Sequence, residues 1–114
     1  MIDFHTRKTA QGTLVIRATG KLDGETNQYF FDCIKDDIEA GHTKIVINFE
    51  GLGYISSVGL GALVRASSRA SKAGGTIYLA QIENSVLDVL RIVSFDKIFK
   101  IYPTEGEAVE AIES

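Results

Sequence analysis

A nearly continuous apolar and β-branched run at residues 44–49 constrains the fold more than any other feature of the sequence. Such a run is typical of a central strand that is covered on one face or both. Apolar residues then recur at helical spacing from Leu60 onward, and Gly74-Gly75 ends the predicted helix. A second strand is predicted at 76–80. The two strands are joined by a helix, so we expect them to lie parallel in one sheet.

Alternating and helical periodicities predict further elements on both sides of this unit. The additional strands are expected at 2–8, 14–18 and 98–102, the first two forming a β-hairpin. A helix that places Phe30, either Cys33 or Ile34, and Ile38 on its inner face is expected to end at Gly41. The sequence therefore predicts an α/β fold, with a mixed sheet of about five strands and about four helices that starts with an N-terminal β-hairpin.

Polar residues mark the expected starts of three helices. Asp23 or Thr26 can cap the first, and Ser85 can cap a short helix that carries apolar residues between 86 and 93. Thr104 and Glu107 have capping-box spacing before the last helix. These starts complete the alternation of strands and helices.

Length and composition restrict the class of protein. A chain of 114 residues fits a single domain, here 1–114, and its net charge of −3 does not favour nucleic acid as a partner. The single cysteine, Cys33, cannot form an internal disulfide and is expected to be a small, unreactive core residue. No long apolar segment is present, so we expect a cytoplasmic protein without direct membrane contact.

Two adjacent hydroxyls, Ser56 and Ser57, follow the central strand at the start of the predicted helix. The carboxyl ends of parallel strands form the working edge of an open α/β sheet, and this turn is expected there. Amide groups at a helix start lack intrahelical partners, so a serine can cap the helix or, once phosphorylated, hold its phosphate there. The local sequence does not decide between helix capping and phosphorylation.

Catalytic chemistry finds little support in the sequence. Neither serine has a glycine two positions before it, as a hydrolase nucleophile turn requires. His42 precedes the strand whose far end carries the serines, at a distance of about 20 Å, and His5 is expected on the first hairpin. Phosphate-binding loops and clusters of metal ligands are absent, so no catalytic residue, cofactor or metal is predicted. The basic side chains Arg65, Arg69 and Lys72 form either a solvated face or a docking surface.

Because the sequence gives little support for catalysis, we expect the two serines to be modified by another protein rather than to catalyse a reaction. A phosphate on Ser57 would add about −1.5 to −2 charges and abolish docking on an acidic or apolar partner surface. Such a modification need not unfold the domain.

Several motifs, in order, resemble the anti-sigma factor antagonist family, the stand-alone STAS domains of bacteria. The main match is 54–61, Tyr-Ile-Ser-Ser-Val-Gly-Leu-Gly, which aligns without gaps to the family signature of an aromatic residue, an apolar residue and D-S-[ST]-G-L-G. The supporting matches are 20–23 (Gly-Lys-Leu-Asp), 45–49, the glycine pair 74–75 and 96–99 (Asp-Lys-Ile-Phe). Together they cover nearly the whole chain.

The resemblance implies a phosphorylation-switched binding module. Its partner would be an anti-sigma factor that is also an ATP-dependent serine kinase, sequestered by the unphosphorylated antagonist and released on phosphorylation, with a serine phosphatase reversing the modification. Ser57 matches the acceptor, and Ser56, which replaces the family's aspartate, is the second choice. The partner-binding residues implied are Asp23, Ser56, Ser57, Val58, Gly59 and Arg65. Val58 replaces the second Ser or Thr.

Two further points are open at this stage. Because Ser56 replaces the aspartate of the signature, an alternative function is also considered, that of a STAS subunit of a membrane transport complex that acts without phosphorylation. Weak self-association into a homodimer is also open.

Overall fold

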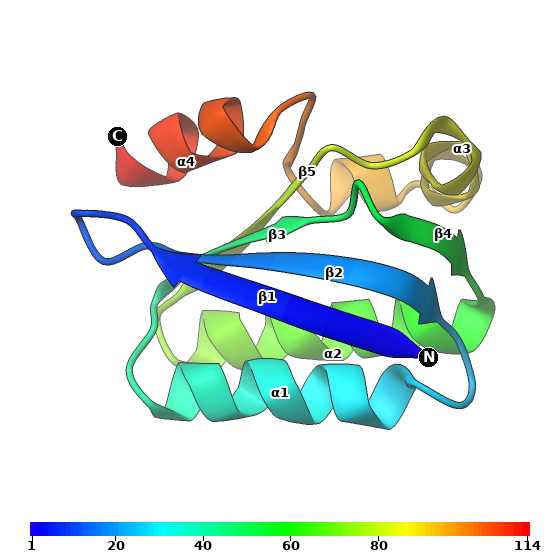
Figure 1. Ribbon diagram of the computed structural model, residues 1–114, viewed down its shortest axis with the longest axis horizontal. Helices are drawn as coiled ribbons and strands as arrows, with labels where there is room; N and C mark the ends of the chain where they lie inside the picture. Colours follow the sequence, from blue (N-terminus) through cyan, green and yellow to red (C-terminus); the bar gives the residue numbers. More distant parts are fainter.

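The computed structural model describes all 114 residues and contains one mixed sheet (Figure 1). Its strands are β1 (Ile2–Lys8), β2 (Leu14–Leu22), β3 (Lys44–Asn48), β4 (Leu52–Ile55), β5 (Thr76–Ala80) and β6 (Ile101–Tyr102). The order is β1-β2-β3-β5-β6, with β1 antiparallel to β2 and every other pairing parallel. The predicted α/β class, the mixed sheet and the N-terminal hairpin are confirmed.

Strand β2 is long enough to pair with two strands in succession. Its first part, from Leu14 to Arg17, pairs with β3, and its last part, from Gly20 to Leu22, pairs with β4. The chain therefore leaves β3, turns, and rejoins the same neighbour as β4. This arrangement carries β4 to the end of the sheet at which β2 leads into the first helix (Figure 1).

Four α-helices and one short 3-10 turn cover the sheet. They are α1 (Asn27–Glu39), α2 (Ser57–Lys72), α3 (Asn84–Ile92), η1 (Phe95–Lys97) and α4 (Glu105–Glu113). Helices α1 and α2 lie side by side on one face, and α4 lies on the opposite face (Figure 1). None of the helices combines the length and apolar character needed to cross a bilayer.

The core is divided by the sheet into a large and a small cluster. Ile45 and Ile47 of β3 belong to the 23-residue cluster, whereas Val46 belongs to a five-residue cluster with Ala108 and Ile112 of α4. Successive side chains of a strand point to opposite faces, so both faces of β3 are buried, as its apolar run predicted.

Several boundaries differ from the predictions. Strand β4 was not predicted, and the predicted strand 98–102 is reduced to Ile101–Tyr102 because η1 ends at Lys97 and Ile98 and Phe99 follow it. Strand β2 continues to Leu22, beyond the predicted end at residue 18.

Two of the three predicted caps are wrong in detail. Ser85 lies inside α3, which begins at Asn84 after Glu83. Thr26 occupies the cap position of α1, but its hydroxyl donates to the carbonyl oxygen of Lys21 at 2.8 Å instead of capping the helix. The cap at Thr104 is confirmed, because its Oγ1 accepts the amide of Glu107 at 3.1 Å.

Cys33 is half-buried and lies outside both core clusters, so its prediction as a core residue is wrong. Ile34 takes the inward position of this turn of α1 and is fully buried. Burial nevertheless raises the pKa of the Cys33 thiol, more than the hydrogen bond with Tyr29 lowers it, and nearby aspartates raise it further. A raised pKa keeps the thiol protonated and weakly nucleophilic, as expected from the sequence.

Candidate functional site

Ser56 joins the end of the sheet to the start of α2. Its backbone is extended, with φ −98° and ψ 172°, and its amide donates to the carbonyl oxygen of Leu22 at 3.0 Å. Its Oγ accepts the amide of Gly59 at 3.1 Å, and its carbonyl oxygen accepts the amide of Leu60 at 2.8 Å. Ser56 is therefore the N-cap of α2 and is anchored to β2, so the family's aspartate is replaced by a residue that caps equally well.

Ser57 is the first residue of α2 and is exposed. Its hydroxyl takes part in no hydrogen bond of the structure, unlike that of Ser56. Val58 follows with 49% of its surface exposed. The amides of Ser57 and Val58 belong to the first turn, where no intrahelical acceptor is available, and the helix dipole is positive there. The site thus presents a free hydroxyl beside groups that favour an anion.

Gly59 is buried where α2 crosses the end of β2. A Cβ atom at this position would overlap the carbonyl oxygen of Leu22, which is the oxygen that holds the amide of Ser56. Gly59 is therefore required for the close approach of α2 to the sheet, and it supports the site without being available to a partner.

Asp23 lies beside Ser56 because β2 pairs with β4. Leu22 is in register with Ile55, so Asp23 and Ser56 are the next residues along two parallel neighbours. The Asp23 carboxylate accepts the amides of Glu25 at 3.0 Å and Thr26 at 3.2 Å. The bond from Glu25 is the main reason that the pKa of Asp23 lies below its usual value. A carboxylate is thus held ionised next to the two serines.

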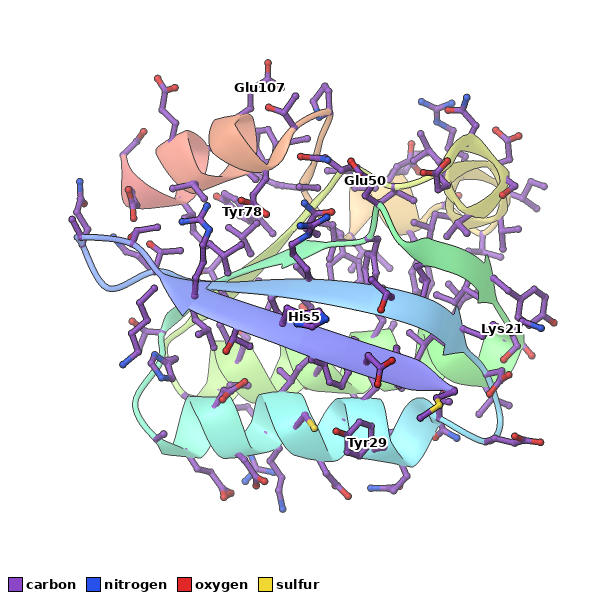
Figure 2. The ribbon with its side chains drawn as sticks, viewed as in Figure 1. His5, Lys21, Tyr29, Glu50, Tyr78 and Glu107 are labelled. Carbon is purple, nitrogen blue, oxygen red and sulfur yellow. The ribbon has the colours of Figure 1, made fainter.

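Lys21 and Tyr54 extend this surface, and neither was predicted as a site residue. They are opposite each other in the β2 and β4 register, and half of the Tyr54 surface is exposed. Figure 2 shows Lys21 at this end of the sheet. Tyr54 could have been predicted as a site residue because it lies in the signature stretch 54–61. Lys21 could not, because its place beside Tyr54 depends on strand β4, which was not predicted.

Arg65 lies two turns beyond Ser57 on α2, and α1 holds its side chain. Its guanidinium is 3.4 Å from Oδ1 of Asn27 and lies 5.2 Å from the ring centroid of Phe31. Arg69 of α2 pairs with Glu39 of α1 at 2.9 Å. Of the predicted basic trio, only Lys72 has no partner, so the three side chains do not form one free cationic patch.

The two histidines lie away from Ser57. His5 lies near the middle of β1, opposite Arg17 (Figure 2). His42 lies before the amino end of β3. Ser57 follows the carboxyl end of β4. No group of three or more histidine, cysteine or acidic side chains is placed to hold a metal ion.

A sequence model of the STAS domain matches residues 5–108. A protein of Thermotoga neapolitana, provisionally named an anti-sigma factor antagonist, is 28% identical over 107 residues, which cover 93% of this chain and 95% of that protein. The anti-sigma F factor antagonist of Paenibacillus polymyxa is 25% identical over 90% of this chain and 89% of its own.

A crystal structure from Thermotoga maritima, also provisionally named an anti-sigma factor antagonist, has the same fold. It superposes with a TM-score of 0.90 at 26% identity, covering 97% of this chain and 95% of that one. The similarity therefore extends over nearly the full length of both chains.

Proposed function

Because this chain belongs to the STAS domain family, we propose that it is an anti-sigma factor antagonist whose binding surface is switched by phosphorylation of Ser57. The observation that carries the proposal is an exposed, unbonded hydroxyl on a rigid helix start, next to a held carboxylate. Relatives that match over nine tenths of the chain carry the name of antagonists, which supports the same conclusion.

The unphosphorylated surface is suited to docking. Ser56, Ser57 and Val58 offer small polar groups and an exposed apolar side chain, and Asp23 adds one negative charge at its edge. The partner proposed is an anti-sigma factor with serine kinase activity, which this surface sequesters in the cytoplasm. Gly59 acts by keeping α2 close to β2, and Arg65 contributes its exposed edge beside α1.

Phosphorylation would change the charge of this surface without disturbing its backbone. A phosphate on Ser57 adds about −1.5 to −2 charges, which the free amides and the dipole of α2 tolerate. The added charge lies near the Asp23 carboxylate, so the surface becomes strongly anionic and repels an acidic or apolar partner. A serine phosphatase would restore binding.

The protein is proposed to act by binding rather than by catalysis. Neither histidine lies at the end of the sheet that carries Ser57, so no histidine is placed to activate its hydroxyl. Ser57 is thus proposed to be the residue that the kinase activity of the partner phosphorylates.

The test is to incubate the protein with ATP and the anti-sigma type serine kinase of the same genome, and to map the phosphate by mass spectrometry. Phosphate is expected on Ser57 in the wild type and in Ser56→Ala, and is expected to be absent in Ser57→Ala. Phosphate on Ser56 alone, or on neither serine, would contradict the assignment.

Binding distinguishes the switch from the alternative function in a transport complex. Ser57→Asp is expected to lose binding to the unmodified partner, while Ser57→Ala retains it. A transport subunit that acts without phosphorylation would instead bind its membrane partner equally well in both variants. Equal binding would therefore favour the transport alternative over the switch.

A further inference from the structure

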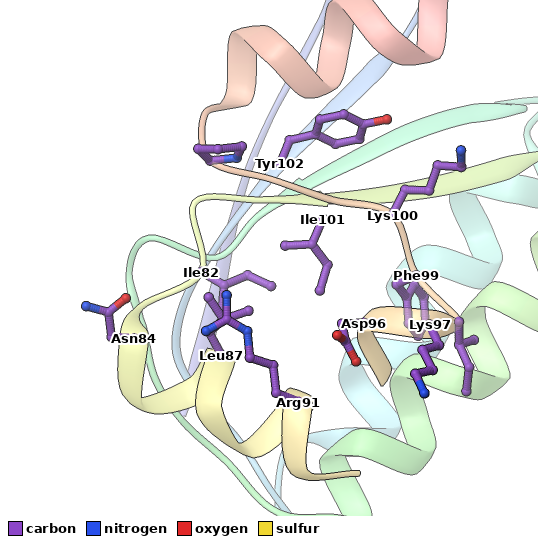
Figure 3. Close-up of a pocket in the computed structure, with 12 residues that line it drawn as sticks. Ile82, Asn84, Leu87, Arg91, Asp96, Lys97, Phe99, Lys100, Ile101 and Tyr102 are labelled. Carbon is purple, nitrogen blue, oxygen red and sulfur yellow. The ribbon is translucent and has the colours of Figure 1, made fainter. Parts of the chain in front are cut away.

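A hollow of about 860 Å³ lies between α3 and the segment that leads from η1 into β6 (Figure 3). Sites for small molecules commonly have volumes of roughly 300–1,000 Å³. The twelve residues that line this hollow include none of the Ser57 site. The hollow is thus a separate feature, large enough for a ligand and without a role in the proposed switch.

Six of the twelve residues that line the hollow are hydrophobic. Ile82 follows β5, Leu87 lies on α3, and Ile101 lies on β6; all three side chains are half-buried. Figure 3 shows Ile82 and Ile101 projecting into the space, with Phe99 next to Lys97. Asn84 is the one amide side chain of the lining, and most of the other polar lining side chains are charged. An extended apolar chain can lie against the three aliphatic side chains.

Three cations surround the apolar walls. Arg91, Lys97 and Lys100 are exposed, and Asp96 is the one carboxylate among the lining residues. The lining therefore has a formal charge of +2 in a chain whose net charge is −3. None of these four side chains takes part in an ion pair. The local charge is opposite to that of the whole protein and is not neutralised within it.

Arg91 differs from the other arginines of the chain. Arg7, Arg17 and Arg69 form ion pairs with glutamates, and Arg65 is held by Asn27 and Phe31. Arg91 alone among the five has no such partner, although it lies at the mouth of the hollow (Figure 3). Its guanidinium is available to a carboxylate in a bidentate geometry.

We propose that this hollow binds a small amphiphilic anion of the medium-chain fatty acid type. The acyl chain would lie against Ile82, Leu87 and Ile101, and the carboxylate would contact Arg91 and Lys97. Burial of the acyl chain supplies the main favourable free energy, because it removes apolar surface from water. The cations then select an anionic head group over a neutral or cationic one.

Decanoate is the probe for the test, titrated into the full chain and followed by calorimetry and by backbone amide chemical shifts. We expect saturable 1:1 binding with shifts concentrated in residues 82–103. Decyltrimethylammonium, which has the same chain length and the opposite charge, is expected to bind at least about fivefold more weakly, equivalent to about 1 kcal/mol.

Charge reversals locate the site. Arg91→Glu and Lys97→Glu are expected to raise the Kd for decanoate by at least about fivefold. Lys72→Glu makes the same charge change on exposed α2, away from the hollow, and is expected to change the Kd by less than about twofold. Both lining variants alter exposed side chains, and their circular dichroism checks that the fold is intact. Absence of saturable binding, equal affinity for decyltrimethylammonium, or an equal effect of Lys72→Glu would overturn the proposal.

Discussion

Gly59 packs so closely against Leu22 that a Cβ atom at position 59 would overlap the carbonyl oxygen of Leu22. The same oxygen accepts the amide of Ser56, so one backbone group of β2 sets both the cap of α2 and the approach of its first turn. The position of Ser57 therefore depends on contacts made by the residues on either side of it. This relationship makes the site rigid before any partner binds.

Gly59→Ala is expected to destabilise the protein by about 1–3 kcal/mol, because the added methyl group must displace α2 from β2. Gly61→Ala is the matched control on the same helix, where the nearest atom to an added Cβ is Nη1 of Arg65 at 3.9 Å. The control is expected to gain up to about 1 kcal/mol, since alanine is a better helix former than glycine. Urea denaturation measures both. Equal stability changes in the two variants would contradict the close contact at Gly59.

Removal of the cap at Ser56 is expected to destabilise α2. Ser56→Ala leaves the amide of Gly59 without its acceptor, at a cost of about 0.5–2 kcal/mol. Ser56→Asp restores the family's aspartate, retains an acceptor and places a negative charge at the helix start, so its stability should equal or exceed that of the wild type. Ser57→Ala, which removes an unbonded hydroxyl, is the control. Denaturation midpoints that do not separate Ser56→Ala from Ser57→Ala would argue against the cap.

The parts of the fold that depend on local chemistry could be predicted from the sequence. The Ser56 cap requires only a hydroxyl and an amide three residues later, and the central strand requires only its own apolar run. On α1, the helical period allowed either Cys33 or Ile34 to face the core, and packing of the whole sheet selected Ile34. A choice between neighbours of similar polarity is made by tertiary contacts.

The parts that depend on distant residues could not be predicted. Strand β4 has only four residues and contains Gly53, and it is stabilised by pairing with the far end of β2. Without β4, nothing in the sequence places Asp23 beside Ser56 in register. Ser85 was a plausible cap, but α3 begins at Asn84 with Glu83 at the cap position, two residues earlier than a Ser85 cap would place it, and Val86 and Leu90 of this helix pack into the core.

A partly buried polar cluster on the other face of the sheet makes stability sensitive to acid. Glu105 accepts hydrogen bonds from Arg7 at 2.6 Å and from Asn48 at 3.0 Å. Burial would raise the pKa of this carboxyl, but the bonds from Arg7 and Asn48 and the nearby arginine charges outweigh it, so the pKa lies below its usual value. The folded state thus favours ionised Glu105 more than the unfolded chain does.

The sign of the pH dependence follows from this lowered pKa. The stabilisation is fully present above the unfolded pKa of about 4.3 and is lost as the pH falls through the lower folded value. Glu105→Gln is expected to be less stable than the wild type by about 1–2 kcal/mol at pH 7, and the difference should shrink below about pH 4. Glu107→Gln, exposed in the same first turn of α4, is the control. A constant difference across the pH range would exclude this account.

Asp23 allows the charge of the proposed docking surface to be separated from its structure. Asp23→Asn retains a side-chain oxygen that can accept the amides of Glu25 and Thr26, so the loop is expected to keep its conformation. The denaturation midpoint is expected to fall slightly, because the lowered pKa of Asp23 means that the folded loop favours the ionised carboxylate. Asp23→Ala removes this acceptor and is expected to loosen the loop. If the carboxylate contacts the partner, both variants bind the anti-sigma kinase several-fold more weakly, as measured by surface plasmon resonance. If Asp23 acts only by shaping the loop, Asp23→Asn binds as the wild type does and Asp23→Ala alone is impaired. The lowered pKa of Asp23 keeps its carboxylate ionised above about pH 5. The contribution of Asp23 to partner binding should therefore not change with pH in that range.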